Sequence, residues 1–196
     1  MVLTGLAIGD APEAWAQLGF AVADGRFTAG GVTVRLAGRG AGDGLLGWSL
    51  AGGVARALPA APEGGPGPEE HPNGVCGVDH VVAVTGDFAA ALAALERDGL
   101  RPRRIREVPA HPPAGERRQA FYVLGPALLE LVGPAEGVAG IAFWGLTLVV
   151  KDLDALAERL GERLGAVRDA VQPGRRIASL RRDEDISVPL AFMTPR

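Results

Sequence analysis

The clearest pattern of hydrophobic and polar positions lies in the middle of the chain. From His80 to Val84 the residues alternate between the two faces of a predicted strand, with His80, Val82 and Val84 on one face and Val81 and Ala83 on the other. After Asp87 the period changes, and an apolar stripe from Phe88 to Leu95 has the spacing of a helix that ends near residue 99. A polar strand and then two strands joined at residues 125–126 follow. This segment is predicted to run strand, helix, three strands.

The same order of elements recurs in the last segment. A strand at 145–150 is followed by Asp152, which lies seven residues after Gly145, just as Asp87 lies seven residues after His80. Each aspartate is expected to cap a helix. The repeat is completed by strands expected within residues 166–171, 175–181 and 188–193. A duplicated unit brings equivalent strand positions to one shared cavity, and His80 is a candidate to line it.

The first segment is predicted to be a shortened third copy. Its strands are expected at residues 4–9, 20–23, 31–38 and 45–52, with one helix face between residues 11 and 18.

Proline and glycine divide the chain into segments. Residues 58–74 hold five prolines and four glycines and are predicted to be a linker. Residues 133–140 form a shorter hinge. The predicted organisation is a shortened module at 1–57, the linker at 58–74, a complete module at 75–134 and another at 141–196.

Composition narrows the classes of function. The chain has 196 residues, 47% hydrophobic residues, 22% charged residues and a formal net charge of -3. Its scattered basic residues provide no footprint for nucleic acid or an anionic membrane. Cys76 is the only cysteine, which excludes an internal disulfide, and neither a signal peptide nor a transmembrane segment is predicted. We expect a cytoplasmic protein whose partners are small molecules or copies of itself.

The order of elements, the Asp79-His80 pair at the first strand, the cap at Asp87 and the hairpin at residues 120–134 resemble the vicinal oxygen chelate superfamily. That superfamily includes glyoxalase I, methylmalonyl-CoA epimerase, extradiol dioxygenases and bleomycin-resistance proteins. The resemblance implies an α+β fold in which βαβββ modules form a curved mixed sheet, a half-barrel around a cavity, with helices on the outer face. It also implies four metal positions on the first and last strands of two modules. His80 and Glu130 fall on two of them.

The chemistry of this pair suits a metal, but the set is incomplete. A neutral imidazole and a carboxylate are ligands for Zn²⁺, Ni²⁺, Fe²⁺ or Mn²⁺, and Glu130 shares a strand face with apolar neighbours. The alternative is a hydrogen-bonded core histidine and a glutamate that reaches solvent. Gly145 and Ala191 occupy the matching positions of the last segment, so half of the ligands are missing. His71 and His111, both in proline-rich loops, are the remaining candidates to complete the set.

Two arginines are candidates for substrate binding. Arg118 and Arg176 lead into the strands that bear or mirror the glutamate position, and guanidinium groups suit carboxylates or phosphates. The alternative is a charged sheet edge that prevents pairing with other strands.

Two functions stay open. The first is a glyoxalase-like lyase or isomerase that acts on a small carbonyl or vicinal-oxygen metabolite. In it a metal bound by His80 and Glu130 stabilises an enolate, and Glu130 is a ligand or the general base. The second is a metal-free protein that binds or sequesters a small molecule, as the bleomycin-resistance branch does. Three modules need partners for their edges, and a homodimer is one way to provide them.

Overall fold

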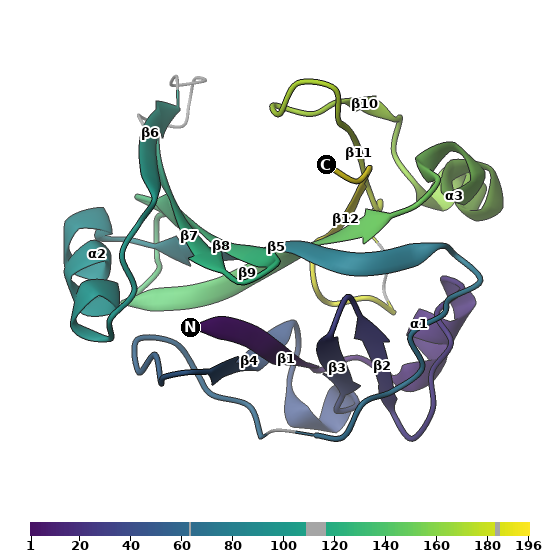
Figure 1. Cartoon of the computed structure of the whole chain (residues 1–196), viewed down its shortest axis with the longest axis horizontal. Coiled ribbons are helices and arrows are strands. Elements are labelled where there is room, and N and C mark those ends of the chain that lie inside the picture. The colour runs from purple at the N-terminus through teal and green to yellow at the C-terminus, as the bar shows by residue number, and fades with distance from the viewer. Residues whose placement is uncertain (63, 109–116, 183–184) are drawn as a thin grey trace.

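The computed structural model describes residues 1–62, 64–108, 117–182 and 185–196. Its strands and helices form two mixed β-sheets and three α-helices, an α+β fold (Figure 1). The elements are β1 (Val2–Ile8), α1 (Pro12–Gln17), β2 (Arg26–Ala29), β3 (Val32–Leu36), β4 (Leu45–Ala51), β5 (Val75–Thr85), α2 (Phe88–Arg97), β6 (Arg104–Val108), β7 (Arg117–Leu124), β8 (Ala127–Gly133), β9 (Ile141–Val150), α3 (Leu153–Leu160), β10 (Arg168–Asp169), β11 (Arg176–Ser179) and β12 (Leu190–Met193), with 3₁₀ turns at Arg39–Ala41 and Gly161–Arg163.

The larger sheet consists of two βαβββ units joined at their first strands. Its order is β10-β11-β12-β9-β5-β8-β7-β6, with β5 parallel to β8, β9 parallel to β12, and β5 antiparallel to β9 at the centre. The sheet curves into a half-barrel with α2 and α3 on its outer side (Figure 1). The predicted fold class is therefore confirmed.

The two outer helices begin where the sequence predicts. The carboxylate of Asp87 accepts a hydrogen bond from the backbone N–H of Ala90 at 2.9 Å. Asp152 accepts from the N–H groups of Asp154 at 3.0 Å and Ala155 at 2.9 Å. Each cap satisfies N–H groups that the first helical turn leaves without a partner. The caps thus fix where each module's first strand turns back over the outer face.

The smaller sheet has the order β2-β3-β1-β4, with β1 parallel to β3 and antiparallel to β4. Two details differ from the sequence prediction. Residues 20–23 form no strand, and the strand β2 begins only at Arg26. β4 lies on the far side of β1 from β3 instead of following β3, so it is related to β1 as β9 is to β5.

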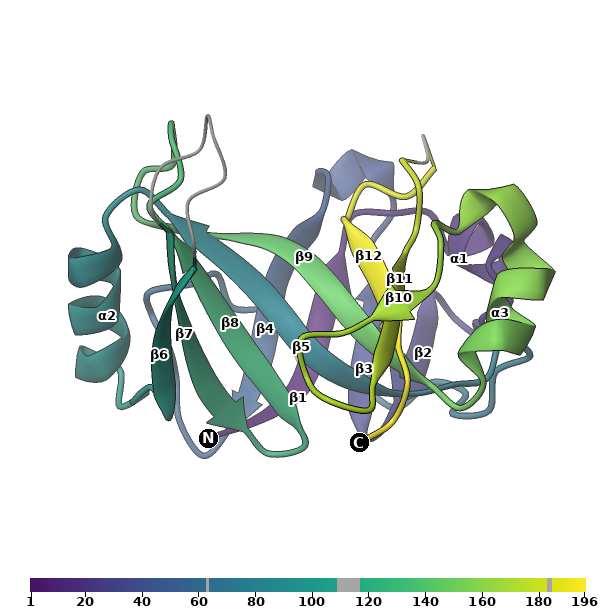
Figure 2. The ribbon, with the colours of Figure 1, turned by 90° about the horizontal axis from the view of Figure 1, so that it is seen from above.

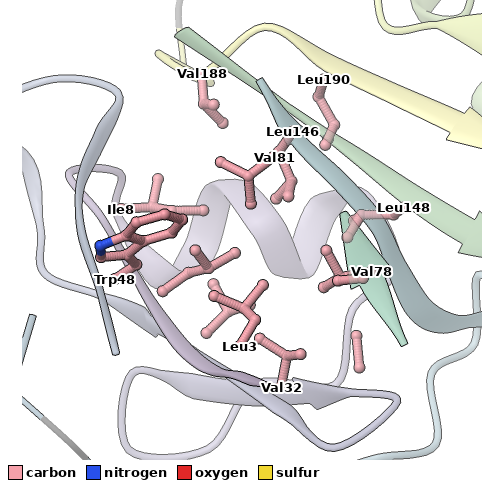
Figure 3. Packing of buried hydrophobic residues seen from close by; sticks show 14 of the residues in the cluster. Leu3, Ile8, Val32, Trp48, Val78, Val81, Leu146, Leu148, Val188 and Leu190 are labelled. Carbon is pink, nitrogen blue, oxygen red and sulfur yellow. The ribbon is translucent and has the colours of Figure 1, made fainter. Parts of the chain in front are cut away.

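A single hydrophobic core lies between the two sheets (Figure 3). Leu3 and Trp48 come from the smaller sheet, whereas Val81, Leu146 and Leu148 come from the outer face of the larger one. All five are almost completely buried. The smaller sheet therefore covers apolar surface that the larger sheet would otherwise expose.

The proline-rich segment is packed and hydrogen-bonded. Ala60 pairs with Trp48 beside β4, and Pro68 accepts a hydrogen bond from the N–H of Thr28 at 2.8 Å. His71 is buried against the rings of Phe20 and Phe27. Between these points Pro62 and Gly64 lie over Thr33, Arg35 and Ser49, on the face of the smaller sheet that points away from the core. None of the helices in the described ranges has both the length and the apolar character needed to cross a bilayer.

Candidate functional site

The candidate site lies on the concave face of the larger sheet, which Figure 2 shows from above, with β5 and β9 crossing its middle. His80 projects from β5 and Glu130 from the neighbouring parallel strand β8, where Glu130 pairs with Val82. Both side chains line a cavity of about 540 Å³. Gln119, Thr147 and Trp144 also line it. The structure therefore brings together the two residues that the sequence singled out.

A β-bulge gives His80 an acidic neighbour. Along β5, Val78 pairs with Leu148 and His80 pairs with Thr147, so Asp79 has no partner on β9. In a regular strand, Asp79 and His80 would point to opposite faces. The bulge re-aims the side chains, and Asp79 Oδ2 lies 2.8 Å from His80 Nδ1.

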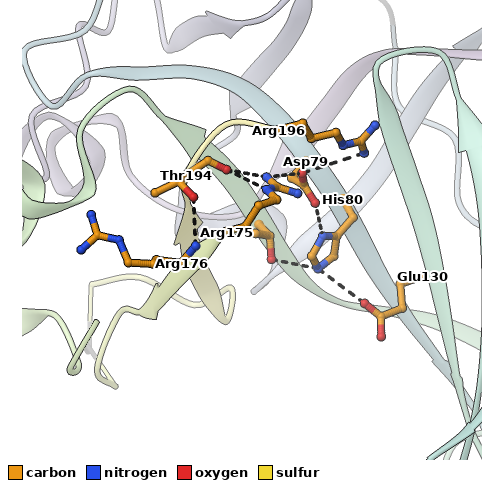
Figure 4. A network of polar contacts seen from close by, with 8 residues as sticks. Asp79, His80, Glu130, Arg175, Arg176, Thr194 and Arg196 are labelled. Atoms are coloured by element: carbon orange, nitrogen blue, oxygen red, sulfur yellow. Dashed lines mark hydrogen bonds and ion pairs between the residues drawn. The ribbon is translucent and has the colours of Figure 1, made fainter. Parts of the chain in front are cut away.

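Asp79 is held ionised by His80 and by Arg175 of the second module (Figure 4). Its Oδ1 is 2.7 Å from Nη2 of Arg175, which also donates from Nε and Nη2 to the carbonyl of Thr194. Burial alone would raise the pKa of Asp79. Hydrogen bonds from His80 and Arg175, together with the charges of both groups, instead lower that pKa to about 2. The ionised Asp79 accepts a hydrogen bond from the Nδ1–H group of His80, and the Nε2 atom of His80 faces the cavity.

The Nε2 atom of His80 has two polar neighbours. Thr147 Oγ1 is 3.0 Å away, and Glu130 Oε2 is 3.5 Å away. Burial raises the pKa of Glu130, and the charge of Asp79 adds to this effect, whereas His80 and Arg106 oppose it. A carboxyl group with a raised pKa next to an imidazole nitrogen is able to take up and release a proton closer to neutral pH than an ordinary glutamate.

More polar groups from β6 and β7 surround Glu130. Arg106 donates from Nε to Oε1 of Gln119, and its guanidinium lies 5.6 Å from the centre of the Phe121 ring. Arg117 lines the cavity together with Gln119. One wall is therefore polar and partly cationic.

The structure does not bring the two predicted substrate-binding arginines to the cavity. Arg118 lies over the ring of Phe88 on the helix side of the sheet, 4.6 Å from its centre. Arg176 forms a double hydrogen bond with Asp154 on α3, at 2.9 and 2.7 Å. Both arginines are placed on the outer side by strand alternation, and Arg117 reaches the cavity instead.

His71 does not complete a metal site. His71 accepts from the N–H of Ala21 through Nδ1 at 3.2 Å and contacts the carbonyl of Thr28 through Nε2 at 2.9 Å. It therefore has a structural role in the smaller sheet. His111 lies outside the described residues. Sequence reasoning missed Asp79, Thr147 and Arg175 as parts of the site, and only the Asp79-His80 neighbourhood gave a signal.

The pairing register shows that the second module has no metal-binding side chain at the two positions that correspond to His80 and Glu130. In the first module Glu130 pairs with Val82, two residues after His80. In the second module Ala191 pairs with Thr147, two residues after Gly145. Gly145 is therefore the counterpart of His80, and Ala191 is the counterpart of Glu130. A Cβ atom at Gly145 would lie 3.1 Å from the carbonyl oxygen of Pro189. Within the described ranges, no cluster of three or more histidine, cysteine or acidic side chains is able to hold a metal ion.

The sequence matches no family model and no curated protein. Among solved structures, a triple mutant of 4-hydroxymandelate synthase from Streptomyces coelicolor matches with a TM-score of 0.61 at 12% identity, covering 100% of this chain and 92% of that one. Methylmalonyl-CoA epimerase from Mycobacterium tuberculosis matches with a TM-score of 0.49 at 23% identity, covering 63% and 90% of the two chains. The first match spans both sheets. The chain therefore has the fold of the vicinal oxygen chelate superfamily.

Proposed function

We propose that the cavity is the active site of a glyoxalase-like lyase or isomerase that acts on a small carbonyl or vicinal-oxygen metabolite. The observation that carries the proposal is the pair of facing groups at its floor, His80 Nε2 and Glu130 Oε2, 3.5 Å apart. The ionised carboxylate of Asp79 orients the imidazole from behind. A cavity that only bound an apolar ligand would need no such dyad.

The chemistry proposed for this pair is proton transfer next to a carbonyl group. Glu130, whose pKa is raised by burial, removes a proton from the carbon beside the carbonyl. His80, protonated at Nε2, donates a hydrogen bond to the substrate oxygen as negative charge develops there. Return of that proton by Glu130 to the neighbouring carbon, the former carbonyl carbon, gives an isomerase, and expulsion of a leaving group from the carbon next to the enolate gives a lyase. Thr147 positions the imidazole through its hydroxyl group.

A divalent metal fits this site only in part. His80 and Glu130 supply an imidazole nitrogen and a carboxylate oxygen, which suit Zn²⁺, Ni²⁺, Fe²⁺ or Mn²⁺. Catalytic zinc sites usually have three protein ligands, and the counterpart positions Gly145 and Ala191 offer none. The described part of the chain therefore offers no complete ligand set for a resident metal centre, and the proposed steps use only groups of the protein.

The second candidate is a metal-free protein that binds or sequesters a small molecule. The incomplete ligand set favours this function. Trp144, which is 54% exposed at the cavity, also favours it, because an exposed indole is a surface on which a planar ligand stacks. A homodimer remains part of the proposal, and sedimentation equilibrium tests it separately.

The test of the proposed function is solvent proton exchange. A panel of small carbonyl and 2-hydroxycarbonyl compounds is incubated with the protein in deuterated water, and loss of the proton beside the carbonyl is followed by NMR. We expect exchange with at least one compound, and a loss of about 100-fold or more in Glu130→Gln and His80→Gln. The matched control is Arg118→Gln, because Arg118 lies on the other face and its loss leaves the cavity intact.

Metal analysis separates the alternatives. The protein is stripped with a chelator, supplied with each of the four ions, and its bound metal is measured beside the His80 and Glu130 variants. Stoichiometric metal that both variants lose would show that the ion takes part. Absence of exchange in every condition, with saturable binding of a compound from the panel, would replace the enzyme with the binding protein.

A further inference from the structure

The smaller sheet repeats the framework of the candidate site. The pairing of β1 with β4 skips Thr4, just as the pairing of β5 with β9 skips Asp79. Gly5 then takes the place of His80. A second irregularity follows at the same distance along each strand. The two sheets therefore share the bulges as well as the strand order. The smaller sheet has its own counterpart of the concave face that carries His80 and Glu130 in the larger sheet.

The position that corresponds to Glu130 carries the opposite charge in the smaller sheet. Glu130 pairs with Val82 across the parallel strands of the larger sheet, and Arg35 pairs with Ala7 in the same way in the smaller one. An arginine therefore occupies the position of the glutamate. Where the larger sheet presents an acid and an imidazole, the smaller sheet presents a cation and a glycine.

A small cavity lies at this counterpart position. Its volume is about 210 Å³, and Thr4, Thr33, Arg35 and Ser49 line it from the sheet. Gly64 closes it from the proline-rich segment. Among the described residues that line the cavity, Arg35 is the only charged one. The hydroxyl groups of Thr4 and Ser49 already donate to backbone carbonyls, so the guanidinium is the main donor left for a ligand.

A second arginine lies beside the first. Arg26 on β2 pairs directly with Arg35 on β3, and its Nε is 3.1 Å from the point that a Cβ atom of Gly64 would occupy. The Nε atoms of both arginines are buried, and neither has a hydrogen-bond partner among the described residues. Like charges directly opposite one another on two strands are destabilising, and so is a buried donor without an acceptor. An anion between them would correct both defects.

We propose that this cavity is a second binding site, for a small carboxylate or phosphate anion held by Arg26 and Arg35. Each guanidinium offers parallel N–H donors that match the oxygens of such anions. At roughly 30 Å³ for each water of liquid volume, the cavity has room for an anion of a few heavy atoms. The proposal does not depend on the chemistry at His80, because the two cavities lie on different sheets.

Inorganic phosphate and malonate are the probes for the test, each compared with sodium chloride at equal ionic strength. We expect either anion to raise the thermal unfolding temperature of the wild type and to bind saturably in calorimetry. Arg26→Gln and Arg35→Gln are each expected to weaken binding by about tenfold or more, which corresponds to loss of one charge-assisted hydrogen bond. Arg101→Gln, at a side chain that is 82% exposed, is the control and is expected to bind as the wild type does.

Two further measurements keep the test independent of variant folding. In the wild type, the ¹⁵N–¹H signals of the two arginine Nε groups are expected to shift on addition of phosphate, and Glu130→Gln is expected to show the same shift. Unchanged Nε signals and an unfolding temperature that responds no more than it does to chloride would overturn the proposal. Glu63 lies outside the described residues. Binding that appears only in Glu63→Gln would also overturn it, since the chain's own carboxylate would then fill the site.

Discussion

Removal of Arg175 should destabilise the protein through the charge that it leaves behind. The Asp79 carboxylate is 2% exposed and lies 2.7 Å from the guanidinium of Arg175, which is itself 6% exposed. Breaking one partner of a buried ion pair costs about 3–5 kcal/mol, because the remaining charge stays buried, and here only His80 would still compensate for it at close range. In Arg175→Met the methylene packing is largely kept. We therefore expect the free energy of unfolding to fall by about 3 kcal/mol at neutral pH.

The pH dependence gives this prediction a second readout. In the wild type the pKa of Asp79 is lowered from 3.8 to about 2. Its contribution of about 2 kcal/mol is present above the unfolded pKa and is lost as the pH falls through the folded one. In Arg175→Met the effect of burial is no longer offset by the guanidinium, so the carboxyl group takes up a proton at a higher pH. The difference in stability between variant and wild type should therefore shrink towards acidic pH.

Urea unfolding followed by tryptophan fluorescence, at neutral pH and near pH 4, measures both effects. Arg176→Met is the matched control, because it removes the next residue's exposed ion pair with Asp154 and should change stability little. If Arg175→Met unfolds at the same urea concentration as the control, the buried charge is not where the structure places it. A large difference that stays constant with pH would show that lost packing, and not Asp79, is the cause.

Three further predictions concern other parts of the fold. Asp10→Ala should cost about 3 kcal/mol in urea unfolding, because the fully buried carboxylate accepts from the indole of Trp15 at 3.0 Å, and Asp10→Asn should cost less. Burial lowers the pKa of His71, so wild-type stability should fall as the pH drops below about 6.5. The melting temperature of His71→Gln should depend less on pH across that range, and a pH dependence equal to that of the wild type would contradict this. Gly47→Ala should cost about 1–3 kcal/mol, since its Cβ would meet linker backbone at 2.8 Å, whereas Gly40→Ala, with open space around it, should melt near the wild type.

The sequence was sufficient for the fold class and for the two residues from which the candidate site is built. Strand alternation and the helix stripe after Asp87 define a βαβββ module, and the register of that module brings His80 and Glu130 onto one face. The absence of ligands at Gly145 and Ala191 also followed from matching the two copies. These features depend on local periods of two and 3.6 residues, which a sequence records directly.

The other site residues depend on register and irregularity, which the sequence does not record. Arg117 and Arg118 are equivalent as letters, and a shift of one residue exchanges the face that each one occupies. Asp79 reaches His80 only because of a bulge, for which the residues around it give no distinct signal. Arg175 lies far from both in sequence and meets Asp79 through tertiary packing alone.

The single core between the sheets has a consequence for folding. Because Val81, Leu146 and Leu148 are covered by Leu3 and Trp48, a chain lacking the first 57 residues would expose a broad apolar surface and should aggregate. The two sheets should then unfold in one cooperative transition, and the rate of folding should be limited by contacts between distant parts of the chain. The smaller sheet is in this sense the structural base of the larger one, and neither half should behave as an independent folding unit.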